Sequence, residues 1–449
     1  MEQWEVISSL IVAYLGLTLW VGLRAGRGTS STVDGFVAGD RNFGFLIMYF
    51  VTGATVFSAF AFLGGPGWAY SRGAAAFYIL SYGVLGMAPW YVIGPKVARI
   101  GRQLGQVTQA QFLTGRFRSR GLSLLIALIS VAALIPYITL QMRGAGIVIE
   151  AVTDGRVPLW LGAAVAYGIV LIYVLVSGVS AVGWTNTLQG VFMIVIAWSL
   201  GLYLPHALYG GIGPMFEAIM SQRPELLELP GLNAVGHAWS WAGYSSAILI
   251  SAIGLTMWPH LFMKAFTARD ERIIRQTVVW FPSFQLFLVP VFLIGFAGVL
   301  FVDALEQPDF ILPHLILNVE LPLIVVGLFC AGALSASMST GDALMHATAS
   351  VAVEDGVGPF VKLDEAKQRL LIRVLIVVAG AVAYFFAVAE GVSLVVLLLT
   401  SYGIIAQLAP PVVAALFWRR ATTPGVIAGL LAGGATTLWF FFSPELKPI

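Results

Sequence analysis

Oxygen-bearing side chains gather in one apolar stretch of the chain, between Ser335 and Asp342. Five of its eight residues carry a hydroxyl or a carboxylate. At helical spacing Ser335, Ser339 and Asp342 fall on one face of a helix. Thr340 lies beside them. Hydroxyl and carbonyl oxygens suit hard cations. The alternative is that the serines and the threonine form hydrogen bonds to neighbouring helices, as is common in membranes. This alternative does not explain the carboxylate. A carboxylate in an apolar span marks a functional site, so the segment predicts cation binding.

A second stretch combines small residues with features that weaken a helix. Residues 53–60 read Gly-Ala-Thr-Val-Phe-Ser-Ala-Phe, and a Gly-Gly-Pro-Gly run follows at 64–67. Transporters coordinate ions with the loose carbonyls of helices broken at mid-membrane. Such a break is tolerated only where protein or a water-filled cavity satisfies the freed backbone groups. The alternative is a glycine-rich surface for close helix packing, and the sequence leaves both interpretations open.

One basic side chain lies well away from the ends of a predicted span. Arg143 ends the segment that begins at Pro136, and it lies roughly 10 Å from the outer end of its helix at about 1.5 Å per residue. Its guanidinium is predicted either to extend to the membrane surface or to point inward and bind a carboxylate.

The composition requires these segments to lie in a membrane. The chain has 449 residues, of which 59% are hydrophobic and only 10% charged, whereas soluble domains are about a quarter charged. Apolar stretches of about 20 residues, the length of a membrane span, recur from end to end and leave no sizeable soluble domain. We therefore predict an all-α membrane protein with about twelve transmembrane helices, at roughly 5–25, 43–70, 74–98, 122–150, 158–179, 185–206, 242–266, 275–302, 319–352, 369–390, 393–418 and 423–442.

The distribution of charge supports this count. With the N-terminus outside, 19 of the 24 lysines and arginines fall in one set of loops, and only four fall in the opposite loops and termini. A wrong helix count would scramble this pattern, because basic loops face the cytoplasm. We expect a multi-pass protein of the cell inner membrane with both termini periplasmic. The lone cysteine, Cys330, excludes an intramolecular disulfide.

Several motifs, in this order, resemble those of the sodium/solute symporter family, which includes carriers for proline, pantothenate, sugars, sialic acid and monocarboxylates. The likeness covers about residues 43–435, almost the whole chain. Its motifs are Phe36 to Arg41, Trp184 to Gln189, Trp258-Pro259-His260, Met338-Ser339-Thr340, Pro410-Pro411 and Phe417-Trp418-Arg419.

The resemblance implies one transmembrane transporter domain, residues 1–449, with a LeuT-like architecture. In this architecture two five-helix repeats have inverted topology, and here they would span 43–206 and 242–418. One extra peripheral helix would lie at each end, at 5–25 and 423–442. The two halves show no plain internal repeat, so this symmetry is an expectation from the resemblance alone.

The resemblance also implies a site for Na⁺, the coupling ion, between the helices at 43–70 and 319–352. Its carbonyl ligands would be Ala54, Phe57 and Ala336, and its hydroxyl ligands would be Ser339 and Thr340. Some relatives bind a second sodium through an aspartate at the position of Asn186 and a hydroxyl at the position of Asp342. Asp342 is therefore either an additional ligand or a sign that the second ion is absent, and we expect one sodium per cycle.

The same resemblance places a solute beside the sodium, with candidate contacts at Ser58, Phe60, Gln141, Arg143, Ser251, Leu255 and Tyr402. One fixed cation among small and aromatic neighbours favours a small carboxylate, such as a monocarboxylate, an amino acid or a pantothenate-like acid. Val56, where proline carriers have an aspartate, weakens the case for a zwitterion. The expected partners are thus a small organic solute and the lipid bilayer, with no nucleic acid and no obligatory protein partner.

Two alternatives remain at this stage. His346 follows Asp342 by one helical turn, and such a pair would allow a proton to be the coupling ion. A nutrient-sensing membrane domain that acts through a separate partner is the other alternative. An enzyme is not expected, because the five histidines show no metal-ligand spacing.

Overall fold

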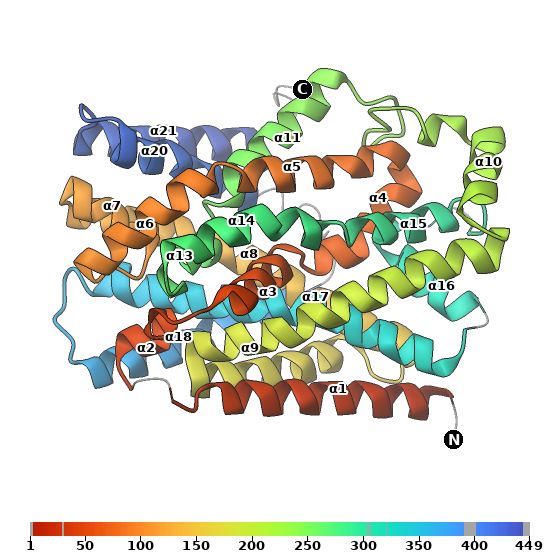
Figure 1. Ribbon diagram of the computed structural model, residues 1–449, viewed down its shortest axis with the longest axis horizontal. Helices are drawn as coiled ribbons and strands as arrows, with labels where there is room; N and C mark the ends of the chain where they lie inside the picture. The colour runs from red at the N-terminus through yellow and green to blue at the C-terminus, as the bar shows by residue number, and fades with distance from the viewer. Residues whose placement is uncertain are drawn as a thin grey trace.

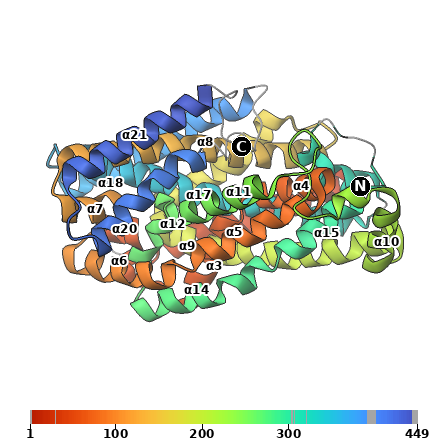
Figure 2. The same cartoon turned by 90° about the horizontal axis from the view of Figure 1, so that it is seen from above.

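The computed structural model describes residues 3–28, 31–302, 305, 307–319, 321–389 and 401–442. Within these residues the chain is all-α, and its helices are consistent with twelve to fourteen membrane spans. The long helices run side by side along the long axis of the molecule (Figure 1). Seen from above, α21 and α14 lie at opposite outer edges, with α9 and α17 between them (Figure 2). The predicted fold class is therefore confirmed.

The first half of the chain contains nine α-helices. They are α1 (Gln3–Ala25), α2 (Val33–Ala38), α3 (Phe45–Val56), α4 (Gly65–Arg72), α5 (Tyr78–Met87), α6 (Trp90–Leu104), α7 (Gln109–Phe117), α8 (Arg120–Val152) and α9 (Leu159–Tyr209). Short 3₁₀ turns η1 (Gly39–Arg41) and η3 (Gly73–Phe77) and a π-helical turn η2 (Phe60–Gly64) join them.

The second half begins with α10 (Ile212–Gln222), α11 (Trp241–Leu255), α12 (Pro259–Phe262), α13 (Lys264–Thr267), α14 (Glu271–Gln285), α15 (Leu288–Gly298) and α16 (Ile311–Asn318). It continues with α17 (Leu323–Val351), α18 (Glu365–Val388), α20 (Ala409–Phe417) and α21 (Thr423–Phe442). The short turns here are η4 (Pro224–Leu226), η5 (Pro308–Phe310), the π-helical η6 (Ala352–Val357) and η7 (Ala406–Leu408).

Six described helices are each long and apolar enough to cross a membrane, and two more spans are helix pairs bent at a break. The predicted span 393–418 falls partly outside the described residues. The short helices α7, α10 and α16 were not predicted, because they are too short to cross a bilayer. The start of α7 is stabilised by an N-cap, in which the Thr108 hydroxyl accepts a hydrogen bond from the Gln111 amide.

Two predicted spans are joined without a loop in α9. Gly178 interrupts this 51-residue element with φ 55° and ψ −141°, a conformation that favours glycine. A Cβ at Gly178 would also lie 2.5 Å from the carbonyl oxygen of Phe36. The sequence did not predict this bend, because Gly178 has no proline beside it to indicate a break.

The core of the bundle contains α17 and the breaks of two helices. The pair Phe45–Val56 and Phe60–Met87 bends by 59°, and the pair Trp241–Leu255 and Pro259–Thr267 bends by 52°. Helix α17 is buried continuously from Phe329 to Val351. The polar residues of α17 therefore face protein on all sides, and the break after α3 lies against them.

Candidate functional site

The break after α3 frees backbone oxygens beside α17. Helix α3 ends at Val56, and Phe57 leaves the helical conformation with φ −95° and ψ 85°. Ser339 Oγ donates to the carbonyl oxygen of Ala54 at 2.8 Å, and Thr340 Oγ1 donates to that of Thr55 at 3.1 Å. Two neighbouring hydroxyls of α17 thus meet two successive carbonyls at the end of α3.

A third carbonyl completes this cluster from within α17. Both Ser339 Oγ and Thr340 Oγ1 lie 3.3 Å from the carbonyl oxygen of Ala336. The structure therefore brings together Ala54, Ala336, Ser339 and Thr340, four of the five predicted ligands. We call these residues, with Thr55, the hydroxyl cluster. All its facing groups are neutral oxygens, the ligand type that suits Na⁺.

Phe57 and Thr55 differ from the prediction in opposite ways. Phe57, the fifth predicted ligand, lies at the break, and its ring packs 4.9 Å from that of Phe287. Thr55 was not predicted as a ligand. Its hydroxyl donates to Asn186 Oδ1 at 2.9 Å, while its carbonyl faces Thr340. The side-chain pattern could not reveal this carbonyl, because every residue carries one.

Asp342 lies one turn further along α17 in a different environment. It is completely buried. Tyr173 OH donates to Oδ2 at 2.9 Å, and Asn186 Nδ2 lies 3.1 Å from both carboxylate oxygens. Thr185 Oγ1 lies 3.1 Å from Oδ2. We call Asp342 and these three partners the carboxylate cluster.

The Asp342–His346 pair considered from the sequence is not formed. His346 Nε2 lies 2.9 Å from the carbonyl oxygen of Phe36, and the two rings pack at 5.6 Å. The imidazole is directed toward α2, whereas Asp342 is directed toward α9. The helical spacing placed the two residues near each other, but the neighbouring helices decide where their side chains point.

Two predicted solute residues meet at the break. Gln141 Oε1 accepts a hydrogen bond from the Ala59 amide at 2.9 Å, and Ser58 Oγ accepts one from the Phe60 amide at 3.2 Å. Gln141 therefore satisfies one backbone group that the break leaves free. Its Nε2 is buried and has no hydrogen-bond partner among the described residues, so a donor remains available there. Phe60 is buried on the other side of the break.

Arg143 lies against the end of another helix. Its Nη1 donates to the carbonyl oxygens of Ala389 at 2.7 Å and Ala387 at 3.4 Å. These carbonyls belong to the C-terminal end of α18, where cations are favoured. The contacts favour a role in holding α18, and contact with a solute carboxylate stays a prediction.

The remaining solute candidates lie near the second broken helix. Ser251 and Leu255 are buried on α11, and Tyr402 is buried with its ring 5.2 Å from that of Trp258. The sequence reasoning missed Trp258 and His260 as possible contacts. Trp258 Nε1 and both ring nitrogens of His260 are buried without a described partner. The Trp-Pro-His motif at the helix break was the available signal.

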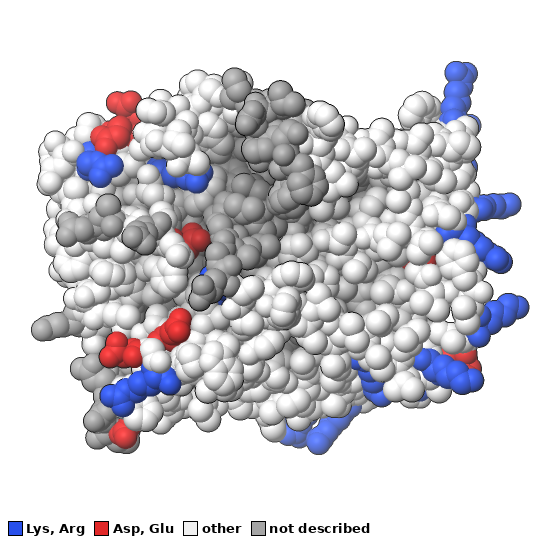
Figure 3. Space-filling view, turned by 180° about the vertical axis from the view of Figure 1, so that it is seen from behind, with Lys and Arg blue, Asp and Glu red and all other residues white. Residues whose placement is uncertain are grey.

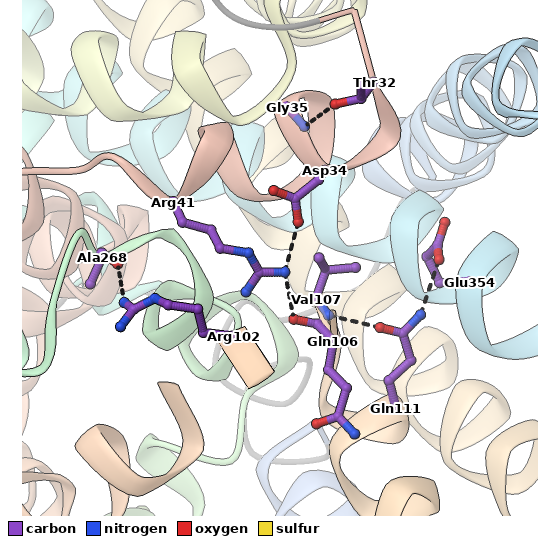
Figure 4. Close-up of polar contacts among 10 residues, drawn as sticks. All are labelled: Thr32, Asp34, Gly35, Arg41, Arg102, Gln106, Val107, Gln111, Ala268 and Glu354. Carbon is purple, nitrogen blue, oxygen red and sulfur yellow. Dashed lines mark hydrogen bonds and ion pairs between the residues drawn. The ribbon is translucent and has the colours of Figure 1, made fainter. Parts of the chain in front are cut away.

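Polar contacts also join distant segments at one end of the molecule (Figure 4). Arg41 Nη2 donates to Asp34 Oδ1 at 2.7 Å and to the carbonyl oxygen of Gln106 at 3.1 Å. Gln111 Nε2 donates to Glu354 Oε2 at 3.0 Å. The segment before α3 is thus tied to the turn before α7, and α7 is tied to η6, which follows α17.

The sequence pattern of the sodium:solute symporter family matches residues 36–433, most of the chain. The chain belongs to the sodium:solute symporter family. The resemblance read from the motifs is thereby confirmed. Na⁺ is the coupling ion of this symporter, its substrate is a small solute, and it is a multi-pass membrane transporter and not an enzyme.

Relatives of known sequence are found in several bacteria. The symporter is 32% identical over 409 residues to the uncharacterized symporter YhjB of Bacillus subtilis, covering 89% of this chain and 81% of the relative. It is 26% identical over 389 residues to the sodium/pantothenate symporter of Escherichia coli, covering 84% and 78%. A monocarboxylate transport permease of Rhizobium johnstonii is 26% identical over 274 residues, covering 60% and 54%.

A solved structure supports the fold assignment. A Na⁺-coupled sialic acid symporter in a substrate-bound, outward-open state superposes with a TM-score of 0.81 at 17% sequence identity, covering 97% of this chain and 98% of that chain. At this identity the likeness concerns the fold alone. The LeuT-like architecture expected from the motifs is confirmed.

Proposed function

We propose that this symporter couples the entry of one Na⁺ per cycle to the uptake of a small organic carboxylate. The observation that carries the proposal is the hydroxyl cluster, where Ser339 and Thr340 meet the carbonyls freed by the break after α3. In the structure the hydroxyls donate to these carbonyls. Rotation of the two hydroxyl hydrogens would turn their lone pairs toward a cation while the carbonyls keep their direction.

The proposed ligands determine the net charge of the occupied sodium site. None of the five proposed ligands (Ala54, Phe57, Ala336, Ser339 and Thr340) supplies a carboxylate, so the ion keeps most of its charge. Its inward movement would then draw on the membrane potential, worth about 2.3 kcal/mol per 100 mV for one charge. A site of this kind uses both the concentration gradient and the voltage.

The proposed solute follows from the relatives and from free donors at the two helix breaks. Two relatives are named for monocarboxylate and pantothenate transport, and both compounds carry a carboxylate. Gln141 Nε2 and Trp258 Nε1 are buried N–H groups without described partners, and N–H donors suit carboxylate oxygens. Arg143 supplies a positive charge on the same helix as Gln141. Ser58, Phe60, Ser251, Leu255 and Tyr402 complete the proposed lining.

The proposed cycle starts with sodium because its ligands lie on two different helices. A sodium bound to Ala54 and Ser339 would hold the end of α3 against α17 and fix the break where Ser58 and Gln141 meet. Solute would then bind with higher affinity, since the site is already ordered. The two repeats, proposed as 43–206 and 242–418, would rock to open inward, and low internal sodium would release both.

The proposed orientation follows from charge. Lysine and arginine side chains project in numbers from one end of the molecule (Figure 3), the end formed by α2, α6 and α7 in Figure 1. Basic ends face the cytoplasm. The start of α1 lies at the opposite end (Figure 1), which supports a periplasmic N-terminus. A periplasmic C-terminus is proposed from the even number of spans.

The solute is tested by uptake into proteoliposomes that hold the purified protein and an inward Na⁺ gradient. Labelled lactate, pyruvate, acetate, pantothenate and proline should include at least one solute that accumulates, whereas glucose, which has no carboxylate, should not. Accumulation of glucose alone would contradict the carboxylate proposal. Arg143→Gln then separates two roles: loss of uptake with retained thermal stability indicates solute binding, and loss of both indicates support of α18.

A further inference from the structure

Lys264 is a buried cation without a direct partner. It lies on α13, directly after the break that follows α11, and is only 5% exposed. No hydrogen bond or ion pair of its ammonium is found within the described part of the chain. It lines two small cavities, one beside Thr52 and Thr277 and one beside His260 and Ala343. A buried ammonium of this kind is costly unless a negative charge balances it.

The Asp342 carboxylate is a buried negative group whose hydrogen-bond partners carry no positive charge. It is completely buried, and its close partners Tyr173, Thr185 and Asn186 are all neutral. The orientation of the Asn186 amide is set by Thr55, whose hydroxyl donates to Asn186 Oδ1. The amide therefore presents N–H groups to the carboxylate and not the oxygen that a second sodium would need.

Lys264 lies beside the part of α17 that carries Asp342. Ala343, the neighbour of Asp342 on α17, lines the same cavity as Lys264. Val182 of α9 also lines this cavity, one turn before Thr185 and Asn186, which hold the Asp342 carboxylate. Among the described residues the two side chains make no direct ion pair, so their charges interact at a distance.

We propose that Lys264 is a tethered counter-ion for Asp342, so that the carboxylate cluster is balanced from within the protein and takes no second sodium. The inference rests on the proposed function for its meaning in transport, because it explains why one sodium suffices. It also gives Lys264 a positioning role: the segment that follows the second helix break is held electrostatically to α17 and to α9.

The test compares Lys264→Met, Asp342→Asn and the double variant in full-length protein. Lys264→Met leaves a buried carboxylate without a counter-charge, and it should lower Na⁺-driven uptake at least tenfold and lower the thermal unfolding midpoint in detergent. The double variant removes both charges, and its uptake and midpoint should both exceed those of Lys264→Met. Lys362→Met, on an exposed loop, is the matched control and should behave as wild type.

The comparison remains decisive if one variant does not fold. If Lys264→Met cannot be purified, a folded double variant supports the pair, and an unfolded double variant overturns it. A purely steric role for Lys264 would leave the double variant no better than Lys264→Met, which would also overturn the proposal. Absence of Na⁺-dependent uptake in wild type would refute the proposed function, whereas the unfolding midpoints would still test the pair.

Discussion

Two polar clusters lie one turn apart on α17 and differ in what they offer a cation. In the hydroxyl cluster, Ser339 and Thr340 face carbonyl oxygens that a broken helix leaves free. In the carboxylate cluster, Tyr173 and Asn186 direct their hydrogens at Asp342. The first presents neutral oxygens and is the proposed site of an exchangeable ion, whereas the carboxylate of the second already accepts several hydrogen bonds. On this proposal, a carboxylate in a span does not by itself mark the ion site.

The largest expected effect concerns the carboxylate cluster. Asp342→Ala removes the shared acceptor of Tyr173 and Asn186 and leaves Lys264 without a counter-charge. Breaking a buried charge pair costs about 3–5 kcal/mol, so we expect a clear fall in thermal unfolding midpoint, measured in detergent. Asp342→Asn should cost less, because the amide oxygen still accepts a hydrogen bond. Equal stability of Asp342→Ala and wild type would remove the distinction between the clusters.

A smaller and different effect is expected in the hydroxyl cluster. Ser339→Ala deletes one proposed sodium ligand and leaves the carbonyl of Ala54 in place. The Na⁺ concentration for half-maximal uptake should rise about tenfold, equivalent to about 1.4 kcal/mol, with little change in unfolding midpoint. Ser350→Ala is the control on the same helix, since its hydroxyl bonds to the backbone of His346 and to no other described residue. If both variants change Na⁺ activation alike, Ser339 is not a ligand.

The smallest expected effect lies where the two clusters touch. Thr55 donates its hydroxyl to Asn186 and offers its carbonyl to Thr340. Thr55→Val removes the first contact and keeps the second, so stability should fall by about 1 kcal/mol. Half-maximal Na⁺ should shift only two- to threefold, roughly, and Thr55→Ser should restore it. A shift as large as that of Ser339→Ala would mean that the Thr55 side chain itself holds the ion.

The comparison also shows what the sequence could and could not predict. The all-α fold, the number of spans and the family followed from apolar length, charge sorting and motifs, because these depend on residue type. Ala54, Ala336, Ser339 and Thr340 were named together and lie together. The carbonyl of Thr55 was missed, since backbone direction leaves no trace in residue types.

Other features depend on which neighbour a side chain meets. His346 bonds to Phe36 and not to Asp342, and Arg143 bonds to carbonyls at the end of α18. Helical spacing within one segment could not predict either contact, because both partners lie on other helices. The bend at Gly178 was hidden inside a continuous apolar stretch. The burial of Lys264 depends likewise on the packing of α13 against the core.

The most direct test of sodium coupling through the hydroxyl cluster is uptake by wild-type proteoliposomes with Na⁺ replaced by choline at a fixed membrane potential. A solute from the panel should accumulate with an inward Na⁺ gradient, and uptake in choline should fall to the level of protein-free vesicles. Activation by Na⁺ should be hyperbolic, as expected for one ion per cycle. Equal uptake in choline, or accumulation driven by a pH gradient without sodium, would contradict the account.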